Sequence, residues 1–234
     1  MPTAAPVRRT QEERSASTQR ALLDAAVACL IEDGYAGLTT TTVADRAGVS
    51  RGAQLHHYPS RAALVAAAVA HVFRGLTEDY QRGFAALGEE RSPARAVALL
   101  WSIFLEPRHE AVLDLYAAAR TDVELRESLL PVALRHRDNV IALAGAYFPE
   151  SADDAHFRLT LDLLLHAMLG MAVSRCLYGD EGVDEGLPKL LETLATDAAS
   201  AAVEPMVRLV ASAQGPLPLA AKPARRRAAK DRAR

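Results

Sequence analysis

Residues 39–61 read TTTTVADRAGVSRGAQLHHYPSR, and this stretch decides the fold. Two short segments with helical spacing of apolar residues lie on either side of Gly48. A threonine of the run can cap the first segment, residues 40–47, and Ser50 can cap the second, which Pro59 ends. The stretch therefore predicts two short helices joined by a glycine-containing turn, which is a helix-turn-helix.

Longer helices are expected on both sides of this motif. Residues 17–33 carry apolar side chains at helical spacing, and Gly34 can end that helix in the left-handed conformation. Ser60 can cap a further helix, whose apolar stripe runs from Leu64 to Leu76. These helices and the motif predict a head of three or four helices.

The rest of the chain also indicates helices packed on helices. Hydrophobic residues make up 50% of the 234 residues and aromatic residues only 5%, and alanine and leucine dominate. Apolar residues recur at helical spacing in residues 99–105, 112–117, 125–147, 156–178 and 187–210. The predicted fold class is all-α, with the helix-turn-helix head followed by an antiparallel helical bundle. Pro131 is expected to kink its helix.

The formal net charge of −2 is unevenly distributed. Residues 1–75 carry eight basic and six acidic residues, whereas residues 76–221 carry twelve basic and twenty-two acidic ones. Residues 222–234 hold seven basic residues and one acidic residue. The first segment and the tail can therefore face phosphate, and the middle segment cannot do so broadly.

Several kinds of protein are not indicated. Residues 1–14 lack the apolar stretch of a signal peptide. The longest apolar stretch, residues 159–173, is shorter than the roughly 20 residues that span a bilayer. Cys29 and Cys176 fit small core residues in a reducing cytoplasm, and no cluster has metal-ligand spacing. Since no catalytic or phosphate-binding motif occurs either, we expect a soluble cytoplasmic protein that is not an enzyme and needs no metal or cofactor.

Residues 18–69 closely resemble the DNA-binding head of the TetR family of regulators. The residues that carry the resemblance are Gly34-Tyr35, Thr39-Thr40, Val43-Ala44, Ala47-Gly48-Val49-Ser50, Gly52, His57-Tyr58-Pro59-Ser60-Arg61 and Leu64. The resemblance implies an omega-shaped, all-helical homodimer with a recognition helix in the major groove and an induction pocket in the C-terminal bundle. One departure is that Gln54 and Leu55 stand where the family usually has an apolar residue followed by tyrosine.

Four segments are expected along the chain on this basis. Residues 1–16 are a flexible basic arm, and residues 17–75 are the DNA-binding domain. Residues 76–214 form the ligand-binding and dimerisation domain, and residues 215–234 are a disordered basic tail. The arginines of the arm either reach a flanking minor groove or are solvated. The tail either adds nonspecific DNA affinity or is idle.

The predicted DNA-binding residues lie on and around the recognition helix. They are Thr40, Ser50, Arg51, Gly52, Ala53, Gln54, Leu55, His56, His57 and Arg61. Gln54 either pairs with an adenine edge or packs inside the head, and Leu55 can touch a thymine methyl group. The expected phosphate contacts are Thr40, Arg51, His56, His57 and Arg61, although His56 and His57 are equally expected as one packed and one solvated residue. Arg61→Ala would lower the slope of log affinity against log salt by roughly one.

The C-terminal region holds weaker candidates for a pocket and an interface. The pocket candidates are Trp101, Phe104, Tyr116, His136 and His166, each of which is otherwise a core residue. The dimer candidates are Leu161, Leu165, Met168, Leu187, Leu191 and Leu194, whose apolar arc is wider than one core face requires. For these too, an intramolecular core is the alternative.

The predicted function is a transcriptional regulator that responds to a ligand. The favoured form is a repressor that binds a palindromic operator in double-stranded DNA as a homodimer and that a small-molecule inducer releases. Two alternatives remain open. One is an activator with the same head, and the other is a helical small-molecule-binding or interaction protein with weak DNA binding.

Overall fold

The computed structural model describes residues 10–179 and 186–197, and within these ranges every regular element is a helix. The elements are α1 (Gln11–Gly37), α2 (Thr40–Ala47), α3 (Arg51–His57), α4 (Arg61–Ala86), the 3₁₀ turn η1 (Gly88–Glu90), α5 (Pro93–Phe104), α6 (Pro107–Ala118), α7 (Val123–Tyr147), α8 (Ala155–Tyr178) and α9 (Gly186–Asp197). The predicted all-α fold is confirmed. The expected continuation of the last helix to residue 210 and the predicted tail lie outside the described residues.

Helix α1 begins earlier than the apolar pattern predicted. The Thr10 hydroxyl accepts a hydrogen bond from Glu13 N at 3.1 Å, and the Glu13 carboxylate accepts one from Thr10 N at 2.8 Å. This reciprocal capping box starts the helix at Gln11, so the prediction that residues 11–16 form a flexible arm was wrong. Gly34 interrupts the helix with a φ of 66° and a ψ of −178°, a conformation open to glycine but different from the left-handed helical cap predicted for it.

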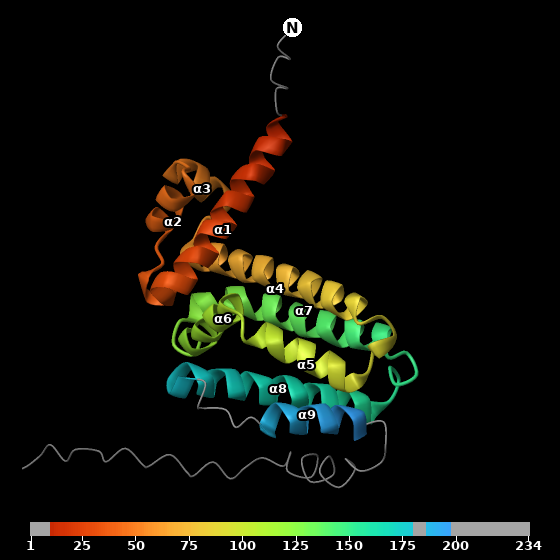
Figure 1. The fold of residues 1–234 in the computed structure, drawn as a ribbon. Helices are drawn as coiled ribbons and strands as arrows, with labels where there is room; N and C mark the ends of the chain where they lie inside the picture. The colour runs from red at the N-terminus through yellow and green to blue at the C-terminus, as the bar shows by residue number, and fades with distance from the viewer. Residues whose placement is uncertain (1–9, 180–185, 198–234) are drawn as a thin grey trace, which may run out of the picture.

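The helices form a head and a layered body (Figure 1). The head consists of α1 to α3 and the first turns of α4, and α1 packs on α2, α4 and α6. Helix α4 leaves the head and runs beside α7 across the body. Helices α5 and α6 lie beneath this pair, and α8 and α9 cover α5 on the side away from α4.

Two apolar clusters hold these layers together. The first joins the head to the body, since it contains Leu22 of α1, Val43 of α2, Phe73 of α4 and Leu125 of α7. The second joins α5, α6, α8 and α9. Helix α4 is continuous across residues 75 and 76, where the domain boundary was predicted. That boundary therefore falls inside a helix that both parts of the molecule share.

Candidate functional site

The helix-turn-helix is built by caps that the sequence predicted. Thr39 caps α2 and accepts a hydrogen bond from Thr42 N at 3.0 Å. Gly48 ends α2 in the left-handed conformation with a φ of 66°. Ser50 then caps α3 and accepts a hydrogen bond from Ala53 N at 3.2 Å. These bonds satisfy helix-terminal N–H groups and fix the angle at which α3 leaves the turn.

One face of α3 is open to solvent. Arg51, Gly52, Leu55 and His56 are exposed, and Leu55 keeps 44% of its surface accessible. A Cβ atom added at Gly52 would meet only the Ser50 hydroxyl oxygen, at 4.0 Å. Packing within the chain therefore does not require glycine at this position. A missing side chain on an exposed helix face lets another molecule approach the backbone closely.

Gln54 faces the opposite way, so the prediction that it reads a base was wrong. Its side chain is fully buried, and its Nε2 donates a hydrogen bond to Tyr58 O at 2.9 Å. This bond satisfies a carbonyl group just beyond the end of α3. The alternative role inside the head is the one that the structure supports. The signal was in the sequence, because the family usually has an apolar residue there.

The Arg61 side chain also turns inward. Its guanidinium lies 3.9 Å from the centroid of the Tyr35 ring, and its Nη2 donates a hydrogen bond to Tyr35 O. The side chain is half-buried rather than extended toward solvent. The predicted phosphate contact by this guanidinium is therefore wrong in this structure, since the group is held in a cation–π contact inside the head.

Tyr35 connects the head to the body. Its hydroxyl donates a hydrogen bond to Asp122 Oδ2 at 2.7 Å, while Asp122 Oδ1 caps α7 by accepting one from Leu125 N at 2.9 Å. The Leu125 N–H, followed by the Tyr35 hydroxyl, lowers the pKa of the Asp122 carboxyl. Desolvation, followed by the bond to Asp122, raises the pKa of Tyr35 to about 12. The first turn of α7 and the end of α1 are therefore held by one hydrogen-bond relay.

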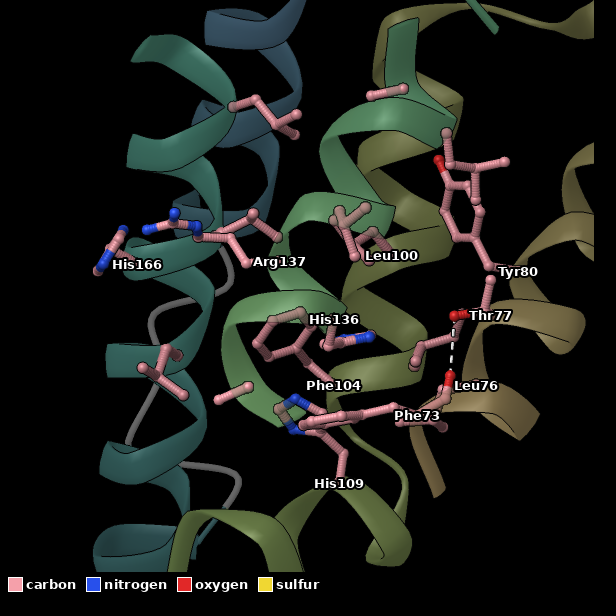
Figure 2. Close-up of a pocket in the computed structure, with 18 of the residues that line it drawn as sticks. Phe73, Leu76, Thr77, Tyr80, Leu100, Phe104, His109, His136, Arg137 and His166 are labelled. Atoms are coloured by element: carbon pink, nitrogen blue, oxygen red, sulfur yellow. Dashed lines mark hydrogen bonds between the residues drawn. The ribbon is translucent and has the colours of Figure 1, made fainter. Parts of the chain in front are cut away.

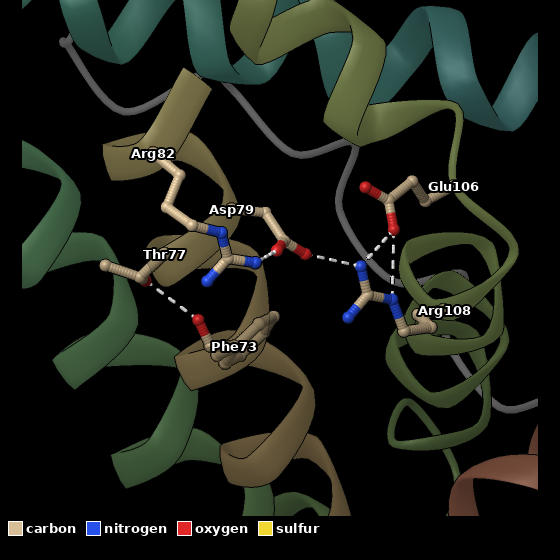
Figure 3. Close-up of polar contacts among 6 residues, drawn as sticks. All are labelled: Phe73, Thr77, Asp79, Arg82, Glu106 and Arg108. Atoms are coloured by element: carbon tan, nitrogen blue, oxygen red, sulfur yellow. Dashed lines mark hydrogen bonds and ion pairs between the residues drawn. The ribbon is translucent and has the colours of Figure 1, made fainter. Parts of the chain in front are cut away.

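An ion-pair network also anchors the C-terminal half of α4. Figure 3 shows Arg108 between Asp79 of α4 and Glu106, with Arg82 on the other side of Asp79. Arg108 Nη2 lies 2.7 Å from Asp79 Oδ2, and Arg108 Nε lies 3.0 Å from a Glu106 carboxylate oxygen. These partners raise the pKa of Arg108, Asp79 most of all. The network ties α4 to the start of α6.

A cavity of about 280 Å³ lies between the layers of the body. Helices α4, α5, α6, α7 and α8 all contribute to its lining. The lining residues include the aromatic or polar side chains Phe73, Thr77, Tyr80, Phe104, His109, Tyr116, His136, Arg137, Asp162 and His166, and the rest are apolar. Four of the five predicted pocket residues, all except Trp101, line the cavity. Trp101 packs instead against the cluster that joins α5 to α8 and α9.

The cavity has two polar regions (Figure 2). His109 and His136 lie close to Phe73 and Phe104, and Arg137 and His166 lie nearer α8. Desolvation lowers the pKa of both His109 and His136 to about 4, so both imidazoles are neutral at neutral pH. Sequence reasoning missed His109, because one histidine on an apolar helix gives no periodic signal.

The comparisons with known proteins agree with this architecture. Residues 22–68 match the family described as bacterial regulatory proteins, tetR family. The chain is 30% identical over 194 residues to an uncharacterised HTH-type transcriptional regulator of Mycobacterium tuberculosis, covering 80% of this chain and 97% of the relative. The chain belongs to the TetR family. It is therefore a DNA-binding transcriptional regulator.

Other known proteins share parts of the sequence or the fold. The HTH-type transcriptional regulator CymR of Pseudomonas putida is 38% identical over 133 residues, which cover 56% of this chain and 66% of CymR. The crystal structure of the multidrug binding protein EbrR with ethidium has a TM-score of 0.60 at 23% identity, covering 76% of this chain and 98% of that chain. A TetR-family structure from Streptomyces coelicolor has a TM-score of 0.59 at 24% identity, covering 76% and 97%. The two structures show the fold alone.

The interface predicted for a TetR-family dimer needs correction. Met168 is fully buried and Leu191 keeps 7% exposure, both within one chain, so neither is free to meet a partner. Leu161 and Leu165 line the cavity, and Leu194 packs on the cluster that joins α8 and α9 to α5. Only Leu187, at 42% exposure, is open. Five of the six predicted interface residues therefore pack inside the chain, because periodicity did not distinguish the inner face of each helix from its outer face.

Helix α8 presents a different apolar face to solvent. The exposed apolar residues of α8 and α9 are Leu159, Leu163, Val173, Leu177, Tyr178, Leu187 and Leu190. On α8, the first four of these follow helical spacing and share one side. By length and composition alone, α8 is long and apolar enough to cross a membrane. This was not predicted from the sequence, because only the shorter apolar stretch of residues 159–173 was considered. Helix α8 packs, however, against α5, α6 and α9, so its opposite face is occupied by the protein.

Proposed function

We propose that this chain is a repressor that binds a palindromic operator as a homodimer and releases it when a small molecule occupies the body cavity. One observation carries the proposal. Helices α4 and α7, which line the cavity, are also bonded to the head through Arg61 and Asp122, and both contacts meet at Tyr35. A ligand that shifts either helix would therefore change the position of the head.

Recognition of the operator is assigned to the open face of α3. Arg51, Leu55 and His56 would contact the major groove, and Gly52 would allow the backbone to approach. The other members of the set are Thr40 at the start of α2, the α3 cap Ser50, and Ala53 and His57 of α3. Gln54 and the Arg61 side chain are excluded because both are held inside the head.

Dimerisation is assigned to the exposed apolar side of α8 with the neighbouring part of α9. Exposed apolar side chains that share one side of α8 indicate a surface that a partner covers. A two-fold dimer would place two copies of α3 roughly 34 Å apart, the spacing of successive major-groove half-sites. EbrR, which shares the fold, has been crystallised with small molecules, in support of a ligand for this cavity.

The decisive experiment is selection of binding sites from random duplex DNA with the full-length chain. We expect an inverted repeat whose half-sites are about one helical turn apart. The selected duplex would then be used to screen small molecules for loss of binding. A non-symmetric selected site would contradict the dimer, and a compound that tightens binding to the duplex would contradict release by an inducer.

A charge in the α8 face tests the dimer separately. Val173→Arg is expected to yield monomers in sedimentation at micromolar concentration, because a charge is costly in an apolar interface. Leu130→Arg is the matched control, since Leu130 is 54% exposed and Val173 is 53% exposed but Leu130 lies on α7. Equal dimerisation by both variants would place the interface elsewhere.

A further inference from the structure

We propose that the cavity selects an uncharged aromatic molecule with a hydroxyl or amino hydrogen-bond donor, and that it discriminates against aromatic carboxylates. This inference rests on the proposed function, since it names the class of ligand for the same cavity. It is carried by buried hydrogen-bond acceptors that the protein itself leaves without partners.

His109 is the first of these acceptors. The residue is 7% exposed, its Nδ1 is buried, and no side chain or backbone group of the described chain bonds to that nitrogen. Its ring centroid lies 4.2 Å from that of Phe104. We assign the proton of this neutral imidazole to Nε2, so that Nδ1 keeps a free lone pair and accepts a hydrogen bond. A buried polar group of this kind gains most from a ligand that completes its hydrogen bonds.

His136 adds a second neutral imidazole to the same region. It stacks on Phe73 with ring centroids 3.8 Å apart and an interplanar angle of 8°. Both histidines stay uncharged at neutral pH, because burial lowers their pKa to about 4. A ligand carboxylate would therefore lose its hydration beside two groups that offer no positive charge.

Asp162 provides a second acceptor without a partner, on the α8 side. Its Oδ1 is buried and has no hydrogen-bond partner within the described chain. Among the residues that line the cavity, all of them within the described ranges, only Arg137 carries a permanent positive charge. Arg137 is half-exposed and its Nη2 lies 3.6 Å from Asp138 Oδ1, and Figure 2 draws its side chain toward α8 rather than toward His109. The carboxylate of Asp162 further disfavours an anionic ligand and favours an N–H or O–H donor.

The walls of the cavity fit an aromatic body. Phe73, Phe104 and Tyr80 line it together with leucine and valine side chains. Aromatic rings stack favourably in such surroundings, and each ring buried adds apolar area removed from water. The expected ligand is therefore a ring compound with an apolar substituent and one or two donor groups.

Three probes of nearly equal shape test the proposal on the full-length protein. They are 4-tert-butylphenol, its methyl ether 4-tert-butylanisole, and 4-tert-butylbenzoate, with binding measured by calorimetry at pH 7.5. We expect the phenol to bind about tenfold more tightly than either of the others, because only the phenol donates a hydrogen bond to the buried acceptors. Tighter binding of the benzoate, or equal binding of all three, would overturn the proposal.

Variants locate the acceptor. His109→Phe keeps an aromatic ring but removes both nitrogens, so the preference for phenol over anisole should fall by several-fold. Thr77→Val is the matched control in the same cavity, since the Thr77 hydroxyl already donates to Phe73 O at 2.8 Å. Asp162→Asn, which keeps the shape of the side chain, should relax discrimination against the benzoate even if His109→Phe does not fold.

The selected operator duplex separates this inference from the proposed function. If none of the probes binds while the protein still holds the duplex, the ligand class is wrong and the regulator stands. If the phenol binds with the expected preference but leaves affinity for the duplex unchanged, the ligand class stands and release by an inducer fails.

Discussion

At the scale of single residues, Gln54 and Leu55 are neighbours with opposite roles. Gln54 is fully buried and bonds to Tyr58 O, whereas Leu55 is 44% exposed on the open face of α3. A helix turns by about 100° per residue, which is enough to send adjacent side chains to different surroundings. The departure from the usual family pattern therefore affects packing at Gln54 and changes the exposed face of α3 at Leu55.

Substitutions at this pair should separate stability from recognition. Gln54→Leu should leave the selected DNA sequence unchanged and alter the free energy of unfolding by about 1 kcal/mol, since it removes one hydrogen bond and one unpaired buried acceptor. Leu55→Ala should leave stability unchanged and weaken DNA binding several-fold. Thermal unfolding and repeated site selection check both outcomes. A changed sequence preference in Gln54→Leu would mean that residue 54 reaches the DNA.

Arg61 illustrates how a charged residue near a helix start can be structural. Its guanidinium covers the Tyr35 ring and bonds to the Tyr35 carbonyl oxygen. We predict that Arg61→Ala lowers the free energy of unfolding by about 1 kcal/mol and leaves the slope of log affinity against log salt unaltered. Salt titrations of the variant and of Arg51→Ala, which is exposed and should lower the slope, provide the comparison. A slope reduced in Arg61→Ala would restore it as a phosphate contact.

At the scale of elements, the contact between α1 and α7 is the proposed route from the cavity to the head. Tyr35→Phe removes one hydroxyl, which donates to the Asp122 carboxylate at 2.7 Å. We expect ligand binding and DNA binding each to persist while the effect of one on the other shrinks several-fold, because the coupling free energy passes through this bond. Calorimetry of the ligand with and without the duplex measures it. Thr77→Val, which lies away from this hydrogen bond, should keep the coupling between ligand and DNA binding. Unchanged coupling in Tyr35→Phe would mean that α4 alone transmits the effect.

The elements themselves were largely predictable from sequence, for reasons that differ between them. Thr39, Gly48 and Ser50 act through their own backbone and near neighbours, so their pattern located α2 and α3 correctly. The start of α1 was missed because an exposed helical turn has no apolar residues whose periodicity could reveal it. The capping-box spacing of Thr10 and Glu13 was nevertheless present in the sequence.

The site was less predictable, because its geometry depends on which helix meets which face. On α8 apolar residues occur on nearly every side, so periodicity could not tell Met168, which is buried, from Val173, which is exposed. The choice depends on the positions of α5, α6 and α9, which are distant in sequence. Arg61 was misplaced for the same reason, since its partner Tyr35 lies 26 residues away.

At the scale of the whole molecule, the two neutral histidines make stability depend on pH. Their pKa is about 4 in the folded state and near 6.5 in the unfolded state, so the unfolded state takes up protons first as the pH falls. Their contribution is therefore complete above pH 6.5, declines between pH 6.5 and 4, and is lost below pH 4. It amounts to about 3 kcal/mol for each histidine at most.

Denaturant unfolding between pH 4 and 8 checks this prediction. The wild-type free energy of unfolding should fall as the pH drops from 6.5 to 4. Replacement of both His109 and His136 by phenylalanine should flatten that part of the curve. A parallel decline in the double variant would assign the acid sensitivity to other groups.

The unbroken course of α4 has a consequence for exchanging specificities between relatives. Helix α4 starts in the head at the Ser60 cap, and its Phe73, Thr77 and Tyr80 side chains line the cavity proposed to bind the ligand. A chimaera joined at residue 75 would therefore take the first half of α4 from one relative and the second half from another. A working hybrid should instead take the whole of α4 from one relative, together with the α6 and α7 surfaces that α4 packs against. Operator specificity and the proposed inducer specificity would then be transferred together, unless those surfaces are redesigned.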